Sequence, residues 1–298
     1  HNYPLVRLPY TKLNYITLED ILGDKYIVKG DDLLWLSIVL SRVSDTHGKI
    51  KERLQYIKDM MPEYEPAETA VIVLGDFGAN YYKTKHDWKT KHQAAKFGYT
   101  IYALRGNHED RACNMEKPIY VIDEFVKGMV LYEEEFPNIR YFMDCISEYE
   151  IMGKKILCIP GAYSVDKWYR LENDWQWFAE EQLTEGEMKY AEEQFSDKYY
   201  DFIFSHTCPI SWEPNDLFLS MIDQSTVDKT MEVWMDKFKD MITWGIWCFG
   251  HYHADRSERP YVEQFYEEIE DLNTIIERWD KYGKTVENTK NFTMKISC

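Results

Sequence analysis

The sequence lacks several features that would assign it to a class at once. It contains no run of about 18 apolar residues, so we expect no transmembrane helix. Its first residues, His1-Asn2-Tyr3-Pro4, lack the basic and apolar regions of a signal peptide. The six cysteines form no C-x-x-C pair. Together these absences predict a cytoplasmic protein with reduced thiols and no membrane contact.

Positive charge is also scarce, with 35 basic against 52 acidic residues and a net charge of -17. Nucleic-acid-binding proteins usually carry a basic face, and no Lys/Arg run of that kind is present. The charge therefore argues against a nucleic-acid partner, although bound divalent cations would reverse the sign locally. Hydrophobic residues make up 45% of the 298 residues, which suits one sizeable globular domain or a domain with an appendage.

Short apolar runs alternate with helical patterns in the first third of the chain. The runs predict buried strands at residues 33–43, 70–74 and 100–104. Ile50, Leu54, Ile57 and Met61 are spaced four, three and four residues apart, which predicts an amphipathic helix that ends before Pro62. A polar helix is predicted at about 83–96. Such alternation is typical of βαβ units and predicts an α/β fold with a parallel core sheet.

Further elements are predicted in the second half of the chain. Residues 139–151 and 155–159 read as a hairpin, and Thr184-Glu-Gly-Glu187 as a capping box that begins a helix through Phe195. Strands are predicted at 200–204 and 243–249, with a helix at about 226–241 between them. The spacing of Phe265, Ile269, Leu272, Ile276 and Trp279 predicts an amphipathic C-terminal helix. We expect Trp168, Trp175 and Trp177 to pack as core, with a substrate-facing lid as the alternative.

Polar side chains follow the predicted strands where each strand ends. The strand at 100–104 leads through Arg105 into Gly106-Asn107-His108-Glu109. Four other fragments have the same character: Ser44-Asp45-Thr46-His47-Gly48, Gly75-Asp76-Phe77-Gly78, Ser205-His206-Thr207 and Gly250-His251-Tyr252-His253. In chain order they read D-x-H, G-D, G-N-H-E, H and G-H-x-H. Because α/β sheets keep their chemistry at the carboxyl ends of strands, we expect these side chains to form one site.

The donor types in these fragments indicate a metal site. Carboxylate, amide oxygen and imidazole ligands suit Mn, Fe or Zn better than Ca. A two-metal hydrolase needs cations about 3.5–4 Å apart, bridged by a carboxylate and a water or hydroxide. The fragments supply that inventory: Asp45, His47, Asp76, Asn107, His206, His251 and His253. His86 and His92 lie in a polar helical stretch without partner motifs, and we interpret them as structural.

The five motifs together resemble the calcineurin-like metallophosphoesterases, the superfamily of the serine/threonine phosphoprotein phosphatases and of many bacterial and phage phosphoesterases. The resemblance covers about residues 35–256. It implies an α/β four-layer sandwich in which two mixed β-sheets are flanked by helices. Residues 1–34 then form an N-terminal extension of unknown role, and residues 257–298 form a C-terminal amphipathic helix and tail packed on the domain.

The resemblance also implies a role for each site residue. Asp45, His47 and His253 would hold one metal ion, Asn107, His206 and His251 would hold the second, and Asp76 would bridge them. Two divalent transition metal ions are expected, Mn first, with Fe, Zn or Ni as alternatives. His108 would protonate the leaving group or stabilise the transition state. Arg105 would hold phosphate oxygens, because the run Leu-Arg-Gly-Asn-His-Glu looks like the phosphoprotein phosphatase form.

The sequence departs from the phosphoprotein phosphatases at two places. Those enzymes follow their G-D with Asp-Arg-Gly, in which the Asp orients the catalytic His and the Arg binds phosphate, whereas Phe77 and Gly78 follow Asp76 here. Ser44 also stands where those enzymes have Gly. Asn80, Asp110 or Arg111 could replace the missing groups, and Lys167 and Arg170 are weaker candidates for substrate contact.

The resemblance implies hydrolysis of a phosphate ester by a binuclear metal centre with a bridging water or hydroxide nucleophile. A phosphomonoesterase is favoured because of Arg105. One alternative is a nucleotide or nucleic-acid phosphodiesterase. An alternative of another class is a catalytically silent phosphoesterase fold used as a binding module. That alternative is disfavoured because the seven ligand positions and His108 are all present.

Overall fold

The computed structural model describes residues 37–41, 48–218, 223–259, 261–266 and 268–281. The predicted extension at 1–34 and the predicted ligands Asp45 and His47 lie outside these ranges. Within them, no helix combines the length and the apolar character needed to cross a membrane.

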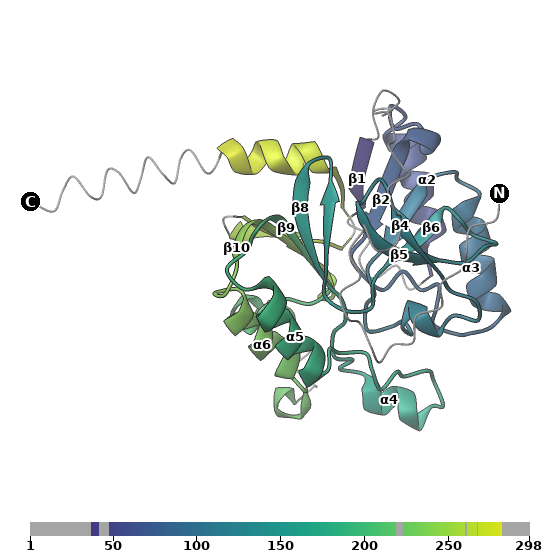
Figure 1. The fold of residues 1–298 in the computed structure, drawn as a ribbon. Coiled ribbons are helices and arrows are strands. Elements are labelled where there is room, and N and C mark those ends of the chain that lie inside the picture. Colours follow the sequence, from purple (N-terminus) through teal and green to yellow (C-terminus); the bar gives the residue numbers. More distant parts are fainter. Residues whose placement is uncertain (1–36, 42–47, 219–222, 260, 267, 282–298) are drawn as a thin grey trace, which may run out of the picture. The chain divides into compact units, whose positions relative to one another are not determined.

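Two mixed β-sheets form the centre of the described part of the chain (Figure 1). Sheet A has seven strands in the order β13-β1-β2-β3-β6-β5-β4, and sheet B has six in the order β11-β12-β10-β9-β8-β7. The strands are β1 Ser37–Ser41, β2 Thr69–Val73, β3 Thr100–Ala103, β4 Ile119–Asp123, β5 Gly128–Tyr132, β6 Ile139–Phe142, β7 Ser147–Ile151, β8 Lys154–Ile159, β9 Tyr199–Ser205, β10 Thr243–Phe249, β11 Arg256–Arg259, β12 Val262–Gln264 and β13 Ile269–Asp271. Strands β1, β2, β3 and β6 are parallel in sheet A, as are β8, β9, β10 and β12 in sheet B.

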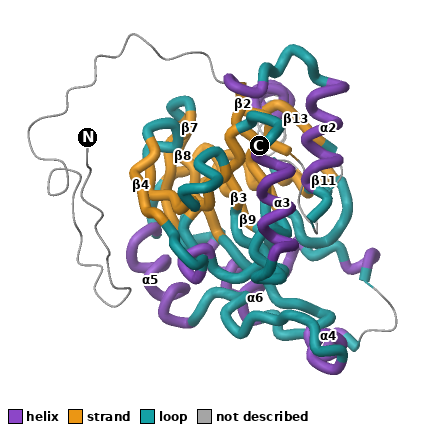
Figure 2. Tube along the Cα trace, turned by 90° about the vertical axis from the view of Figure 1, so that its right-hand side faces the viewer, coloured by secondary structure: helices purple, strands orange, loops and turns teal. Residues whose placement is uncertain are grey.

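Helices and short 3-10 turns connect these strands, as Figure 2 shows. The α-helices are α2 Ile50–Met60, α3 Lys85–Ala95, α4 Lys167–Glu172, α5 Glu185–Phe195 and α6 Thr230–Phe238, and residues 272–281 are also helical. The 3-10 turns are η2 Pro66–Glu68, η3 Ala112–Asn114, η4 Ile210–Trp212, η5 Asn215–Leu217 and η6 Gln224–Thr226. The predicted capping box is present at α5, where Thr184 Oγ1 accepts from the Glu187 N–H and the Glu187 carboxylate accepts from the Thr184 N–H. Two donors at the start of α5 are thereby satisfied.

The packing of the sheets gives four layers, as predicted. Side chains alternate along a strand, so Ala70 and Ile72 of β2 face sheet B while Val71 and Val73 face helices α2 and α3. Sheet B is covered on its other face by α5 and α6, through residues such as Met188, Ala191, Met235 and Phe238. The middle of the sandwich is the apolar cluster between the two sheets, to which the helix at 272–281 adds Leu272, Ile275 and Trp279.

The structure corrects three details of the predicted elements. The C-terminal amphipathic pattern is only partly helical, because Ile269 begins β13 and the helix starts at residue 272. The predicted hairpin is confirmed only in part: β7 and β8 pair antiparallel in sheet B, whereas β6, at the start of the segment 139–151, is a separate strand of sheet A. The antiparallel pair β4–β5 was not predicted. Strands β11, β12 and β13 belong to the two sheets although they follow residue 255.

The prediction for the tryptophans was wrong for two of the three. Trp168 is 61% exposed and Trp175 is 55% exposed, so neither packs as core. Both belong to residues 161–183, a connection between β8 and α5 that includes α4 and that we call the cap segment.

Candidate functional site

The carboxyl ends of the parallel strands in both sheets meet at one edge of the sandwich. Strand β2 leads to Asp76, β3 to Asn107 and His108, β9 to His206 and β10 to His251. Hydrogen bonds join the two sheets at this edge. His206 Nδ1 donates to the Leu74 carbonyl oxygen at 2.8 Å, and the Gly161 N–H donates to the Arg105 carbonyl oxygen at 2.8 Å. The strand ends are therefore held together by one side-chain and one main-chain hydrogen bond.

Three acceptor atoms converge beside His206. Because Nδ1 donates to a carbonyl oxygen, the neutral ring presents a lone pair at Nε2. His206 Nε2 lies 2.9 Å from Asn107 Oδ1 and 3.6 Å from Asp76 Oδ2. All three side chains are buried, with His206 0% exposed. Lone pairs brought together in a buried place repel one another unless a proton or a cation lies among them.

The orientation of the Asn107 amide is fixed by its neighbours. Asn107 Nδ2 donates to Ser164 Oγ at 2.9 Å, and Ser164 Oγ donates in turn to Glu181 Oε2 at 2.6 Å. Glu181 also accepts from the Ser164 N–H at 3.0 Å. Since the amide nitrogen is engaged on that side, the amide oxygen must face His206 and Asp76. The two ends of the cap segment thus set the direction of a predicted ligand.

Two glycines permit the close approach of the loops. A Cβ on Gly75, whose φ is +108°, would lie 2.0 Å from Nδ1 of His206. A Cβ on Gly106 would lie 2.0 Å from Oδ1 of Asp76. Both distances are far below van der Waals contact, so any side chain at either position would displace a predicted ligand.

Three of the predicted ligands have left-handed backbone conformations. The φ angles are +52° for Asp76, +69° for His251 and +52° for His253. Such conformations cost a non-glycine residue roughly 1–3 kcal/mol and are concentrated at functional sites. The surrounding structure holds Asp76 in place, since its Oδ1 accepts from the His108 N–H at 2.8 Å.

The two histidines after β10 have different surroundings. The ring of His251 meets that of His206 edge to face, with centroids 5.1 Å apart. Burial lowers the pKa of His251 well below its ordinary value, and His206 adds to this effect. A neutral imidazole is the form that binds metal ions. The ring of His253 is exposed and stacks on Tyr266 at 4.9 Å.

His108 is half-buried and lies against an arginine from the cap segment. Nη2 of Arg170 contacts both ring nitrogens of His108, at 2.5 Å from Nδ1. Tyr81 stacks on His108, with ring centroids 6.3 Å apart. The guanidinium carbon of Arg170 lies 5.8 Å from the centre of the Tyr81 ring. Sequence reasoning gave Arg170 only a weak role, because no motif links it to His108 across 62 residues.

Arg105 is buried beneath the Gly106–Glu109 loop. Its Nη1 donates to the carbonyl oxygens of Glu180 and Glu181, at 3.3 and 2.7 Å, and its Nε lies 3.8 Å from Asp144 Oδ1. Nη2 is buried without a hydrogen-bond partner among the described residues. These contacts tie the far end of the cap segment to the loop that carries Asn107 and His108.

Glu109 joins two loops of the site, a role that sequence reasoning did not assign. Its Oε1 accepts from the Gly78 N–H at 2.8 Å and its Oε2 from the Gly106 N–H at 3.3 Å. Burial and the neighbouring Asp76 carboxylate raise the pKa of Glu109 to about 8. The letters G-N-H-E would not reveal this bridge, because the partners of Glu109 are main-chain N–H groups, one of which belongs to another loop.

Comparison with known protein families bears on what this edge does. The model of the calcineurin-like phosphoesterases matches residues 43–255, most of the chain. The chain belongs to this family. A comparison with curated individual proteins found no match. Calcineurin-like phosphoesterases hydrolyse phosphate esters and generally use a binuclear centre of divalent metal ions.

The donors at the strand ends fit the metal centre of a calcineurin-like phosphoesterase. Asp76, Asn107 and His206 turn oxygen or nitrogen lone pairs toward one another, and His251 adds a neutral imidazole beside them. In the described ranges no three His, Cys, Asp or Glu side chains are placed so that they could hold an ion by themselves. That result covers only part of the predicted ligand set, because Asp45 and His47 lie outside those ranges and Asn107 is an amide.

Asn80, Asp110 and Arg111, the candidates for the groups that phosphoprotein phosphatases carry after G-D, make contacts with other parts of the chain. The main-chain oxygen of Asn80 accepts from the Asp110 N–H at 3.0 Å. Arg111 forms two hydrogen bonds to the Glu187 carboxylate, at 2.5 and 3.0 Å. Arg170, from the cap segment, contacts the ring of His108 instead.

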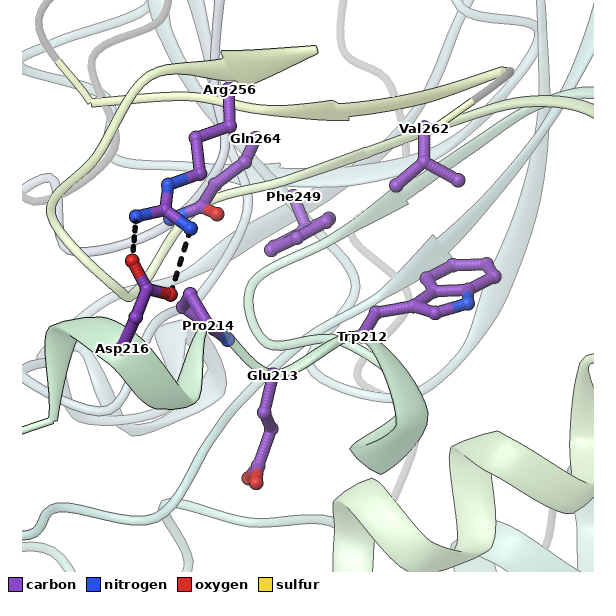
Figure 3. Close-up of a pocket in the computed structure, with 8 residues that line it drawn as sticks. All are labelled: Trp212, Glu213, Pro214, Asp216, Phe249, Arg256, Val262 and Gln264. Atoms are coloured by element: carbon purple, nitrogen blue, oxygen red, sulfur yellow. Dashed lines mark hydrogen bonds and ion pairs between the residues drawn. The ribbon is translucent and has the colours of Figure 1, made fainter. Parts of the chain in front are cut away.

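Two cavities lie near the ends of the sheets, and the predicted ligands line neither. The smaller, about 110 Å³, lies beside the end of β10 between Phe249, Val262 and Gln264, and an ion pair between Arg256 and Asp216 borders it (Figure 3). The larger, about 510 Å³, lies along α3 and η3 and is lined by both acidic and basic side chains, such as Glu133 and Lys91. Neither cavity therefore contains the edge at which Asp76, Asn107 and His206 converge.

Proposed function

We propose that this phosphoesterase hydrolyses phosphate monoesters with two divalent transition metal ions, Mn first among them. Asp45, His47 and His253 would hold one ion, Asn107, His206 and His251 the other, and Asp76 would bridge the two. Bound cations would activate a water molecule and neutralise phosphoryl charge. The reaction consumes one water and one ester and releases an alcohol and phosphate.

The chain's own residues prepare this reaction. The Leu74 carbonyl oxygen holds His206 in the tautomer that presents Nε2. The His108 N–H holds one oxygen of Asp76, which leaves the other directed toward His206. His108 would give a proton to the ester oxygen as the P–O bond breaks. Arg105 would add positive charge to the phosphate site, through the Nη2 that has no partner among the described residues.

The observation that carries the proposal is the convergence of Asp76 Oδ2, Asn107 Oδ1 and His206 Nε2 beside His108. Acceptors of this kind need a cation between them, and a histidine at their edge supplies a proton donor. The free thiols of Cys113, Cys145, Cys158, Cys208 and Cys248 support a reducing compartment, and we place the protein in the cytoplasm as part of the same proposal.

The test combines metal analysis with hydrolysis assays. Purified protein, supplemented with Mn, is assayed with p-nitrophenyl phosphate and bis-p-nitrophenyl phosphate, and its bound metals are counted. We expect about two metal ions per chain and faster turnover of the monoester. Asp76→Asn and His108→Ala should each abolish turnover, and Asp76→Asn should also lower the metal content. His86→Ala, on the exposed face of α3, is the matched control and should change neither.

The outcomes separate the alternatives. Faster turnover of the diester would replace the proposal by a phosphodiesterase. Bound metal without turnover of either ester would indicate a binding module. The same trace activity in the wild type, Asp76→Asn and His108→Ala would refute the proposed enzyme.

A further inference from the structure

Arg170 is a buried cationic side chain with an unsatisfied donor. The residue is 1% exposed. Its Nε donates to Asp166 Oδ2 at 2.9 Å, and its Nη2 contacts His108. Its Nη1 is buried and has no hydrogen-bond partner among the described residues. Leaving a charged donor unsatisfied in the interior costs more than the roughly 1–3 kcal/mol of a neutral one, so such a group calls for an explanation, of which a bound acceptor is one.

The surroundings hold the guanidinium in one orientation. Asp166 anchors one edge within α4, and the ring of Tyr81 lies beside the guanidinium carbon at 5.8 Å. The cap segment that carries α4 is itself fixed, because Ser164 bonds to Asn107 and Glu181 to Arg105. The guanidinium is therefore largely preorganised, and a ligand needs to displace only the contact between Nη2 and His108.

The chemistry of the guanidinium selects the ligand. A guanidinium has only donors, so any group that binds Nη1 and Nη2 must be an acceptor. Two phosphoryl oxygens can accept two parallel hydrogen bonds from the two Nη groups of the guanidinium. The contact between Nη2 and His108 places the fork next to the residue that would act on the leaving group.

We infer that Arg170 binds a non-bridging phosphoryl oxygen of the substrate, in place of the arginine that phosphoprotein phosphatases carry after G-D. The inference rests on the proposed function, since it assumes a phosphate ester at this edge. Nη2 leaves His108 and turns to phosphate when substrate binds. A monoester has one more negative charge than a diester, so Arg170 favours the monoester. Asp166 acts as a positioning residue for Arg170.

The experiment compares charge-removing and charge-keeping variants. Arg170→Gln, Arg170→Lys, Arg105→Gln and Asp166→Asn are assayed for KM and kcat on both chromogenic esters and for inhibition by inorganic phosphate. Binding of inorganic phosphate is also measured by calorimetry, which does not require turnover. Lys189→Gln, whose side chain on α5 is 76% exposed, removes the same charge at a distance and serves as the control.

We expect Arg170→Gln to weaken phosphate binding and raise KM for the monoester by roughly 10- to 100-fold, the range for a hydrogen bond to a charged group. KM for the diester should change less, and Arg170→Lys should restore phosphate binding only in part. Lys189→Gln should match the wild type. If Arg170→Gln does not fold, Arg170→Lys and Asp166→Asn test the same inference, through the change in KM for the monoester compared with that for the diester.

Each contrary result has a distinct meaning. Phosphate binding within about twofold of wild type in Arg170→Gln would overturn the inference, as would equal losses on both esters with full rescue by Lys. Wild type that turns over no ester but binds phosphate through Arg170 would refute the proposed function and support the inference. Wild type that binds no phosphate would refute this role of Arg170.

Discussion

Replacing Glu232 by glutamine is expected to make the protein more stable at alkaline pH. Glu232 lies on α6 and is 4% exposed; its Oε1 accepts from Thr207 Oγ1 at 2.9 Å, and its Oε2 has no partner among the described residues. The pKa of this carboxyl is raised from 4.5 to about 7, mainly by burial and to a smaller extent by Glu213, while Thr207 and Lys229 oppose the shift.

The sign and size of the effect follow from proton linkage. Between pH 4.5 and 7 the folded protein keeps a proton on Glu232 that the unfolded chain releases. The protonated carboxyl therefore makes its full contribution to the free energy of unfolding below pH 4.5. That contribution is lost as the pH rises through 7. The shift corresponds to about 3 kcal/mol, an order-of-magnitude value, above pH 7. Glutamine mimics the protonated form, so Glu232→Gln should remove this loss.

Urea unfolding at pH 5, 6, 7 and 8 measures the effect. The difference in unfolding free energy between Glu232→Gln and wild type should be small at pH 5 and approach about 3 kcal/mol at pH 8. Glu193→Gln is the control, because that side chain on α5 is 59% exposed and should leave the pH dependence unchanged. Parallel curves for Glu232→Gln and wild type would refute the reasoning.

Three further outcomes are expected. Gly75→Ala should lose bound metal and unfold at lower urea, because its Cβ would lie 2.0 Å from Nδ1 of His206. Gly153 also has a left-handed φ, +74°, but a Cβ there would have no atom of the described residues within 4 Å. Gly153→Ala should therefore lower the free energy of unfolding by only about 1–2 kcal/mol. Equal losses in the two variants would contradict the clash at Gly75. Glu187→Ala should destabilise by roughly 3 kcal/mol in the same assay, since it breaks the capping box and leaves Arg111 buried, whereas Glu187→Gln should lose less. Chelation should lower the thermal midpoint and Mn should restore it, and an unchanged midpoint would argue against bound metal.

The strand ends could be predicted from sequence because their signals are local. An apolar run followed at once by Asp, Asn or His marks both the strand and the polar group at its end, as at Asp76 and Asn107. The capping box at Thr184 was predictable for the same reason. Where the pattern was ambiguous the prediction failed: Ile269 fits a helical spacing, but it begins β13, which pairs with the edge of β1. Strand pairing overrode local periodicity there.

The contacts of the cap segment could not be predicted because they join distant residues. Arg170 and His108 are 62 positions apart, and nothing in the local sequence of α4 indicates that its arginine points inward while Trp168 points outward. The same holds for Glu109, whose partners are main-chain N–H groups, and for Ser164, which orients Asn107. Trp168 was expected in the core because tryptophan is usually buried. It lies instead on α4, a six-residue helix outside the layers, where no apolar core of the described residues is within reach.

The attachment of the cap segment to the proposed metal-binding edge would couple cation binding at that edge to the position of the cap segment. Ser164 orients the amide of Asn107, so, if that edge binds a cation as proposed, a displacement of the cap segment would change its affinity. Thermodynamic linkage then requires the converse: a cation bound there must favour the attached cap by the same free energy. The exposed aromatic face of α4 would thus report on events at the interior edge, with Trp168 as a fluorescent sensor that the chain already contains.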